Sequence, residues 1–258
     1  MKTISFLDQT SAHLPELMSK ADRTDLSLDK IIATDMLIGT PLTNKIKVAW
    51  LIEPECVMPQ TYKYIKDRHE RFEHVLTHSR ELLDLIPNAK FVPFGTTFLR
   101  EDEIKIYEKS KMVSMVASGK KFTPGHRFRH EVLNSLRGKI DLFGREINPI
   151  DRKIEGLKDY RYSIAIENSK HDYWFTEKLL DCFLSGTVPI YWGCPSLDKF
   201  FNMSGVIAAD SVDVINQVAS TLNENDYISR KEAIEENFKL AKQYINTYDT
   251  VYKIVEDL

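Results

Sequence analysis

Polar residues cluster between two apolar segments in residues 166–193, which read IENSKHDYWFTEKLLDCFLSGTVPIYWG. The cluster contains Glu167, Asn168, Glu177 and Lys178. Strand-like hydrophobic segments do not usually bracket so many charged and hydrogen-bonding groups merely to form a surface. A bound ligand is therefore the first hypothesis for this stretch.

Two predicted helix starts favour a phosphorylated ligand. Glu177 and Lys178 open one predicted helix, and Arg127 lies in the first turn of another. A helix N-terminus presents free backbone N–H groups and a partial positive charge, which favour a phosphate. Two such ends with Arg127 and Lys178 suit a diphosphate. Because an acid beside a phosphate costs energy unless it faces something else, Glu177 is expected to accept hydrogen bonds from vicinal ribose hydroxyls.

Each of these residues also has a simpler structural explanation. Glu177 can complement the helix dipole, and Asn168 can be a turn residue after a strand. Arg127 and Lys178 can be exposed helix charges. What the residues share is a place at the carboxyl ends of predicted strands, and ligands of open parallel sheets bind outside those ends. This shared location favours the ligand hypothesis.

The elements that carry these residues alternate between strand and helix patterns, which predicts an α/β protein with parallel sheets. The predicted strands are 3–7, 30–38, 47–52, 74–78, 89–95, 112–118, 139–144, 160–168 and 187–193, and the predicted helices are 60–72, 79–86, 125–138, 177–185, 211–222 and 230–245. Thr123 and Thr176 are predicted N-caps, and Gly138 and Gly186 stand just past the ends of the same two helices.

A charged run, residues 100–111, separates the two halves, and the predicted domains are 1–108 and 109–258. Its acids, Glu101, Asp102 and Glu103, lie between other charges rather than at the end of an apolar strand. We therefore expect a solvated helix start or linker there and no metal site.

Composition narrows the class of protein. The formal net charge is −3, so broad capture of nucleic acid is not expected. A local basic patch that suits a small anion is formed by Lys120, Lys121, Arg127 and Arg129. The three cysteines form no CxxC pair, which predicts free thiols of a reducing compartment. No segment approaches the roughly 18 apolar residues of a membrane span, so we expect a cytoplasmic protein without a transmembrane segment.

The stretch 160–193, YRYSIAIENSKHDYWFTEKLLDCFLSGTVPIYWG, resembles the signature of the α-1,3-fucosyltransferases, glycosyltransferase family 10. Upstream, RFRHEVLNSLRGKIDLFGR, WLIEP and VPFG are similar to further segments of that family. The resemblance runs from about Lys47 to Asn202. One departure is DYWFTEK, which has one residue more before Thr176 than is usual in the family.

The resemblance implies a GT-B-like fold, in which two Rossmann-like domains with parallel sheets face a central cleft. Residues 1–108 would be the acceptor-side domain and residues 109–258 the domain that binds the GDP-sugar, with the last helix able to cross back to the first domain. The implied reaction is an inverting transfer of fucose from GDP-fucose to a hydroxyl group of an acceptor glycan. Neither a cofactor nor a metal ion is expected.

The resemblance also implies roles for individual residues. Glu53 would be the general base of catalysis. The donor-binding residues would be Arg127 and Lys178 on the diphosphate, Glu177 on the ribose, and Asn168 with Tyr173 or Trp174 on phosphate or fucose. His126 and His130, which flank Arg127 on the predicted helix, are expected to be structural.

The acceptor implied by the resemblance is a GlcNAc- or glucose-type sugar of a surface-glycan precursor, linked α-1,3. Two alternatives remain. One is a transferase of the same fold that uses another nucleotide sugar, since phosphate and ribose contacts do not identify the sugar. The other is a non-catalytic protein that binds a nucleotide sugar, which would have no use for Glu53.

Overall fold

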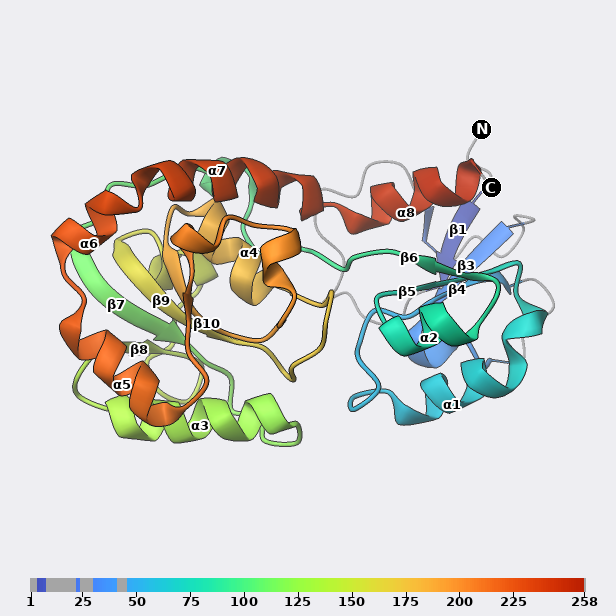
Figure 1. Ribbon diagram of the computed structural model, residues 1–258, viewed down its shortest axis with the longest axis horizontal. Coiled ribbons are helices and arrows are strands. Elements are labelled where there is room, and N and C mark those ends of the chain that lie inside the picture. Colours follow the sequence, from blue (N-terminus) through green and yellow to red (C-terminus); the bar gives the residue numbers. More distant parts are fainter. Residues whose placement is uncertain (1–3, 8–21, 24–29, 41–45, 258) are drawn as a thin grey trace. The chain divides into compact units, whose positions relative to one another are not determined.

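A computed structural model describes residues 4–7, 22–23, 30–40 and 46–257 of the chain. They form two compact units (Figure 1). The first unit is Met1–Thr96 with His171–Trp174 and Asn246–Leu258, and the second is Thr97–Lys170 with Phe175–Ile245. The chain thus changes unit at Thr96, before the charged run, whereas the predicted boundary was 108/109. Helix α8 (Thr247–Glu256) belongs to the first unit.

The first unit is built on a six-stranded parallel sheet with the order β2-β1-β3-β4-β5-β6. Its strands are β1 (Ile4–Leu7), β2 (Asp22–Arg23), β3 (Lys30–Thr34), β4 (Ile46–Trp50), β5 (His74–Thr77) and β6 (Ala89–Phe91). Its other helices are α1 (Pro59–Arg68) and α2 (Arg80–Leu85).

Both faces of this sheet are buried. In β4, Val48 and Trp50 pack in a cluster with residues of α8. Ala49 of β4 and Leu51, which follows the strand, pack in a cluster with residues of α1 and α2. This alternation follows the two-residue period of a strand. A strand buried on both faces reads as a continuous apolar run, which is why the run 47–52 was recognisable in the sequence.

The second unit contains a five-stranded parallel sheet with the order β11-β10-β9-β7-β8. The strands are β7 (Lys111–Val116), β8 (Asp141–Phe143), β9 (Tyr160–Ile166), β10 (Val188–Trp192) and β11 (Ile207–Ala208). The helices are α3 (Pro124–Leu136), α4 (Glu177–Leu184), α5 (Val212–Thr221), α6 (Glu224–Ser229) and α7 (Lys231–Ala241).

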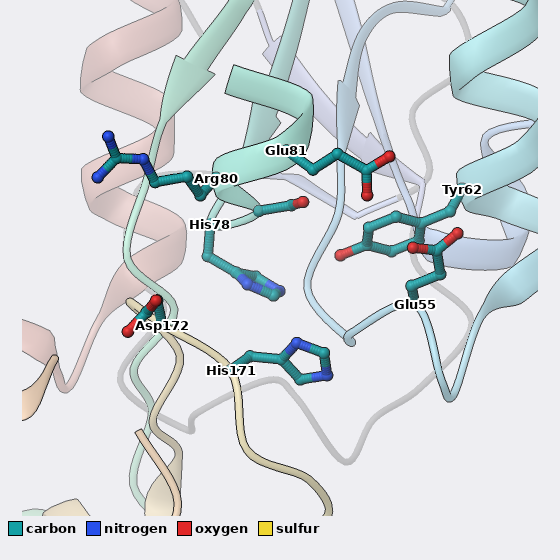
Figure 2. Close-up of a pocket in the computed structure, with 8 residues that line it drawn as sticks. Glu55, Tyr62, His78, Arg80, Glu81, His171 and Asp172 are labelled. Atoms are coloured by element: carbon teal, nitrogen blue, oxygen red, sulfur yellow. The ribbon is translucent and has the colours of Figure 1, made fainter. Parts of the chain in front are cut away.

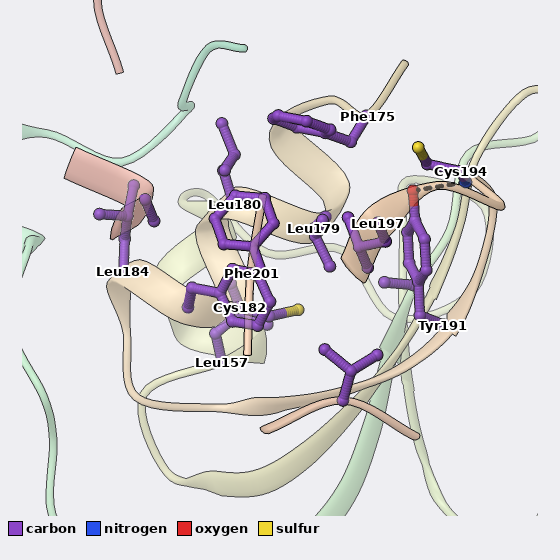
Figure 3. Packing of buried hydrophobic residues seen from close by; sticks show 14 of the residues in the cluster. Leu157, Phe175, Leu179, Leu180, Cys182, Leu184, Tyr191, Cys194, Leu197 and Phe201 are labelled. Carbon is purple, nitrogen blue, oxygen red and sulfur yellow. Dashed lines mark hydrogen bonds between the residues drawn. The ribbon is translucent and has the colours of Figure 1, made fainter. Parts of the chain in front are cut away.

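Helices cover this sheet on both faces as well, with α3 and α5 on one side and α4 and α7 on the other (Figure 1). Leu179 and Leu180 of α4 belong to one apolar cluster, which also contains Tyr191 of β10 (Figure 3). Phe183 of α4 is part of the same cluster. The cluster fixes the direction of α4. Its first turn therefore stands at the carboxyl ends of β9 and β10.

Short 3-10 helices complete the described chain: Asp35–Leu37, His69–Arg71, Glu101–Glu103, Lys153–Gly156, Leu197–Lys199, Met203–Gly205 and Lys242–Tyr244. The first of these explains why β3 ends earlier than the apolar run 30–38 suggested. Asp35 has a positive φ of 41°, which turns the chain out of the strand. Among the described residues, no helix combines the length and the apolar character needed to span a membrane.

The α/β class with parallel sheets is confirmed, and so are the two predicted caps. Thr123 Oγ1 accepts a hydrogen bond from His126 N, and Thr176 Oγ1 accepts one from Lys178 N. Gly138 and Gly186 have φ of 79° and 72°, the left-handed conformation that glycine adopts readily after a helix.

The acidic run 101–103 begins a short helix as expected, but its last residue is not solvated. Glu103 is buried, accepts a hydrogen bond from Arg100 N, and pairs with Arg152 at 2.6 Å. The expectation of a solvated segment was wrong at this position because Arg152, far away in the sequence, supplies a counter-charge.

Candidate active site

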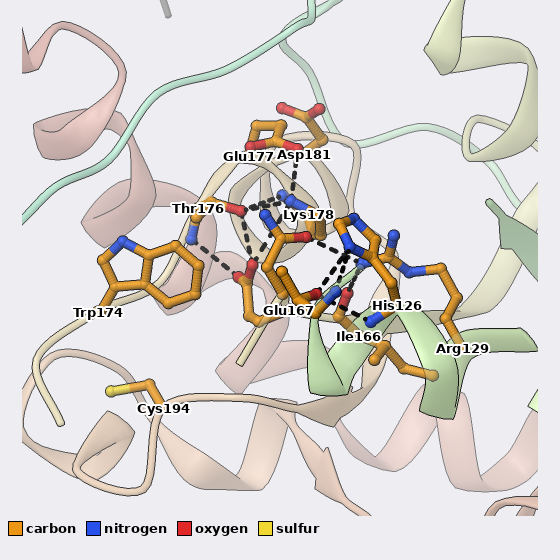
Figure 4. A network of polar contacts seen from close by, with 12 residues as sticks. His126, Arg129, Ile166, Glu167, Trp174, Thr176, Glu177, Lys178, Asp181 and Cys194 are labelled. Carbon is orange, nitrogen blue, oxygen red and sulfur yellow. Dashed lines mark hydrogen bonds and ion pairs between the residues drawn. The ribbon is translucent and has the colours of Figure 1, made fainter. Parts of the chain in front are cut away.

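The candidate active site begins at a buried carboxylate. Glu167 follows β9 directly and is 0% exposed. Its Oε1 accepts a hydrogen bond from Thr176 N at 2.9 Å, and its Oε2 accepts one from Thr176 Oγ1 at 2.7 Å (Figure 4). Burying a carboxylate is costly unless it is hydrogen-bonded and paired. Both bonds tie the end of β9 to the start of α4.

Lys178 supplies the charge that pairs with this carboxylate. Its Nζ lies 3.6 Å from Glu167 Oε2 and 2.9 Å from Glu177 Oε1, and it donates to Thr176 Oγ1 at 3.1 Å. The ammonium group is therefore held between two carboxylates at the first turn of α4, at the positive end of the helix dipole.

Burial and charge act in opposite directions on these three groups. Burial raises the pKa of Glu167. Burial would also raise the pKa of Glu177, but Lys178 and Lys153 outweigh it and lower that pKa to about 2. For Lys178, burial opposes the charge, yet Glu177 and Glu167 raise the pKa of the ammonium group. Glu177 and Lys178 are thus an ion pair at neutral pH.

A second ion pair braces the same helix turn. Lys153 Nζ donates to the carbonyl oxygen of Glu177 at 3.0 Å and pairs with Asp181 Oδ2 at 2.7 Å. Asp181 is fully buried, and its Oδ1 accepts a hydrogen bond from Thr97 Oγ1 at 2.6 Å. These contacts fix the backbone that carries Glu177.

Helix α3 brings a buried guanidinium group to the end of β9. Arg129 is 4% exposed and donates to the carbonyl oxygen of Ile166 and, at 3.4 Å, to Asn168 Oδ1. Gly125 allows this approach because a Cβ atom there would lie 1.9 Å from the carbonyl oxygen of Glu167. Only a glycine can place the first turn of α3 so close to β9.

His126 is buried beside these charges. Its Nδ1 lies 2.7 Å from Thr123 Oγ1, and the two residues form a capping box. Burial, followed by the positive charges of Arg129 and Lys178, lowers the pKa of His126 to about 4. The ring is therefore neutral at physiological pH and adds no charge to the cluster. The expected structural role of His126 agrees with these contacts.

Arg127 lies outside the cluster. It is exposed, and its Nη1 donates to the carbonyl oxygen of Phe122 at 3.5 Å. Arg127 was predicted to bind the donor, whereas Arg129 was predicted only as part of a basic patch. A helical pattern could have identified the buried arginine, because Arg129 shares the spacing of Val132, Leu133 and Leu136 on the buried face of α3.

Of the predicted donor-binding residues, the structure brings together Asn168, Glu177 and Lys178. Asn168 is half-buried, and its carbonyl oxygen accepts a hydrogen bond from Gly125 N at 2.9 Å. It therefore joins α3 to the loop after β9. Arg129 and Glu167 belong to the same cluster and were not among the predicted site residues.

Tyr173 and Trp174 lie in the first unit. Trp174 is 1% exposed, and its indole Nε1 donates to the carbonyl oxygen of Ile52 at 3.0 Å. Tyr173 has a φ of 62°, and its hydroxyl group accepts a hydrogen bond from Arg80. The chain turns at Tyr173, next to the position of the extra residue. Donor binding by either ring stays a prediction.

Glu53 also lies in the first unit, after β4. Asp35 Oδ1 accepts hydrogen bonds from Ile52 N at 2.9 Å and from Glu53 N at 3.2 Å. Tyr62 donates its hydroxyl proton to the Glu53 carbonyl oxygen at 3.2 Å. These bonds hold the Glu53 backbone in a defined position at a strand end.

No metal centre is evident in the part of the chain that the structure describes. No group of three or more His, Cys, Asp or Glu side chains there is arranged to hold an ion. The three cysteines are free, and Cys182 and Cys194 are buried.

Comparison with known proteins identifies the family of the chain. The family model described as glycosyltransferase family 10 (fucosyltransferase), C-terminal part, matches residues 106–250. The α-(1,3)-fucosyltransferase FucT of Helicobacter pylori is 42% identical over 53 residues, which are 20% of this chain and 11% of that protein. Human 4-galactosyl-N-acetylglucosaminide 3-α-L-fucosyltransferase 9 is 29% identical over 163 residues, 60% of this chain and 42% of that protein.

The chain therefore spans less than half the length of either relative. It also superposes on the crystal structure of an α1,3-fucosyltransferase with a TM-score of 0.53 and 16% identity, over 91% of this chain and 82% of that one. Two α/β units with parallel sheets and this structural likeness define a glycosyltransferase fold of the GT-B class. Because the family model covers more than half of its residues, the chain belongs to glycosyltransferase family 10, the fucosyltransferases.

The ion pair of Glu177 predicts a specific pH dependence of stability. A carboxylate with a lowered pKa stabilises the folded state above its unfolded pKa, and this stabilisation is lost as the pH falls through the folded pKa of about 2. We expect Glu177→Gln to lower the free energy of unfolding at pH 7 by roughly 1–3 kcal/mol, with the deficit shrinking below about pH 4.5.

Urea unfolding between pH 7 and pH 3 measures this deficit. Glu235→Gln, which changes an exposed carboxylate on α7, is the control and should leave the unfolding free energy within about 0.5 kcal/mol of the unmodified protein. A constant deficit of Glu177→Gln across this pH range would contradict the assignment of a half-buried, ionised Glu177.

Proposed function

We propose that this protein is an inverting fucosyltransferase that moves fucose from GDP-fucose to a hydroxyl group of an acceptor glycan. The proposed linkage is α-1,3 to a GlcNAc- or glucose-type sugar. Membership of the family supports the reaction class. The bacterial and human relatives are α-1,3-fucosyltransferases by name, which supports the linkage.

The observation that carries the proposal is the half-buried ammonium group of Lys178 at the first turn of α4. It pairs with Glu177 and Glu167. A diphosphate at the N-terminus of α4 would meet the positive end of the helix dipole and would take Lys178 as its counter-charge. Glu177 would then exchange Lys178 for the ribose hydroxyls, while Lys153 continues to hold its backbone.

Arg129 is the second cation that we assign to the donor. Its guanidinium group already donates to Asn168 Oδ1, so a phosphate or fucose oxygen beside Asn168 would meet both side chains. We assign this donor-binding role to Arg129 rather than to Arg127. Arg127 is exposed, and its guanidinium group donates a hydrogen bond to the carbonyl oxygen of Phe122.

In the proposed reaction, the Glu53 carboxylate takes the proton of the attacking acceptor hydroxyl. The oxygen of that hydroxyl forms a bond to the anomeric carbon of fucose, on the face opposite GDP. The bond between the anomeric carbon and the phosphate oxygen breaks, and its electron pair leaves with GDP. Lys178 and Arg129 stabilise the negative charge that develops on the diphosphate. The configuration at the anomeric carbon is inverted.

The phosphate role of Lys178 predicts a selective loss of affinity. Lys178→Met keeps most of the apolar stem and removes the charge, so GDP should bind at least roughly tenfold more weakly, whereas guanosine affinity should change much less. Calorimetric titration with both ligands measures the two effects. Lys170→Met, which removes an exposed lysine paired with Asp210, is the matched control and should leave GDP binding unchanged. Equal losses for GDP and guanosine would argue against the role.

The general-base role of Glu53 predicts loss of turnover without loss of donor binding. Glu53→Gln should lower the transfer of labelled fucose from GDP-fucose to a glycan array by roughly 100-fold or more, with GDP affinity nearly unchanged. Glu73→Gln, an exposed carboxylate of the same unit, is the control. Unaltered turnover in Glu53→Gln would remove Glu53 from the mechanism. A preference of the unmodified enzyme for UDP-sugars would refute the fucose assignment.

A further inference from the structure

A polar pocket of about 230 Å³ lies in the first unit, apart from the residues assigned to the donor. Figure 2 shows the side chains around it. It is lined by Glu55, Tyr62, His78, Ser79, Arg80, Glu81, His171 and Asp172. All of these residues belong to the first unit, because the segment His171–Trp174 is part of it.

The pocket occupies the usual position of a ligand site in an open parallel sheet. His78 directly follows β5, and Glu55 follows the neighbouring strand β4. Ligands bind outside the carboxyl ends of such strands. Tyr62, which lines the pocket, donates its hydroxyl proton to the Glu53 carbonyl oxygen, so the pocket adjoins the proposed general base.

His78 is the strongest sign that the pocket binds something. It is 1% exposed, and neither ring nitrogen has a hydrogen-bond partner among the described residues. The carbonyl groups of Ile52 and Glu53 are near enough to influence its charge, but they do not meet hydrogen-bond geometry. A buried polar group without a partner destabilises the folded protein, so its retention beside a pocket points to a ligand.

The protonation state of His78 indicates the chemistry of that ligand. Burial, followed by the neighbouring His171, lowers the pKa of His78 to about 3, so the ring is neutral and has one N–H donor and one acceptor nitrogen. Burial lowers the pKa of His171 as well. A hydroxyl group both donates and accepts a hydrogen bond, so it complements a neutral imidazole at either nitrogen.

The charges around the pocket disfavour an anionic ligand. Three carboxylates among the described residues line the pocket, those of Glu55, Glu81 and Asp172, whereas Arg80 is the one arginine in that lining. Lys66 lies 3.1 Å from Glu55 Oε1 and 2.8 Å from Glu81 Oε1, so it offsets part of this negative charge. A carboxylate or sulfate on the ligand would meet a net negative lining.

We propose that this pocket binds one neutral sugar residue through its hydroxyl groups, with His78 as the buried hydrogen-bonding partner. Its volume is below the roughly 300 Å³ at which pockets for drug-sized molecules begin, which suits one sugar ring rather than a nucleotide. Identifying that sugar as the acceptor rests on the proposed function, whereas the binding itself does not.

Ligand-detected NMR titration with three simple glycosides tests the proposal. The probes are methyl β-glucoside, methyl N-acetyl-β-glucosaminide and methyl β-glucuronide. At least one neutral glycoside should bind the unmodified protein, and the glucuronide should bind roughly threefold or more weakly than the glucoside. Absence of binding by both neutral glycosides, or equal binding of the glucuronide, would overturn the proposal.

The His78→Leu variant separates ligand binding from a structural role. It should weaken the neutral glycoside by roughly threefold to tenfold and leave GDP affinity unchanged. It should not lower the free energy of unfolding, because it removes an unpaired buried polar group. His74→Leu, which changes the imidazole at the opposite end of β5 from His78, is the control. The proposal would be overturned if the His78→Leu variant bound the glycoside as strongly as the unmodified protein, or if the variant were unfolded.

Asp172→Asn tests the charge argument at an exposed position. It should narrow the difference in affinity between the glucoside and the glucuronide. An unchanged difference in affinity would contradict the proposed effect of the lining charges on ligand choice. Transfer from GDP-fucose, measured in parallel, separates the two hypotheses. Glycoside binding that depends on His78 without any transfer would retain the pocket and refute the function. If His78→Leu transfers fucose with an unchanged KM for the acceptor, the proposed function is retained and the role of the pocket in acceptor binding is refuted.

Discussion

The buried carboxylate of Glu167 is the group on which the candidate donor site depends. It stands at the end of the central strand β9. It accepts hydrogen bonds from the backbone N–H and the hydroxyl group of Thr176, and it lies near the ammonium group of Lys178. Without it, a backbone N–H, a hydroxyl group and an ammonium group would lose a partner in a place with little water. The entry of the chain into α4, and with it the position of Glu177 and Lys178, follows from this one side chain.

The cluster around Glu167 balances its charges internally. Glu167, Glu177 and Asp181 are close to Lys178, Arg129 and Lys153, with the shortest ion pairs at 2.7 and 2.9 Å. In the proposed complex, a diphosphate binds by an exchange of partners, in which Lys178 turns from Glu177 to the phosphate. The affinity for the donor would then include the loss of one ion pair and the gain of the ribose contacts of Glu177.

Much of the fold could be predicted from the sequence because it depends on local patterns. Apolar runs such as 47–52 predicted buried strands, and Thr123 and Thr176 predicted the starts of helices. The site was predicted less completely, because its contacts join distant segments. Arg129 is buried because of the helix face on which it lies, and its spacing to Leu136 could have predicted that face. The partner of Glu103 and the unpaired ring of His78 depend on packing between distant segments, which no local sequence pattern predicts.

The central claim is that a nucleoside diphosphate binds at the first turn of α4 with Lys178 as its counter-charge. A crystal structure of the protein with GDP tests it most directly. The account predicts a phosphate oxygen within hydrogen-bond distance of Lys178 Nζ, and Glu177 turned away from Lys178 toward the ribose. A diphosphate bound elsewhere, or one that leaves the Glu177–Lys178 pair at its present 2.9 Å, would contradict it.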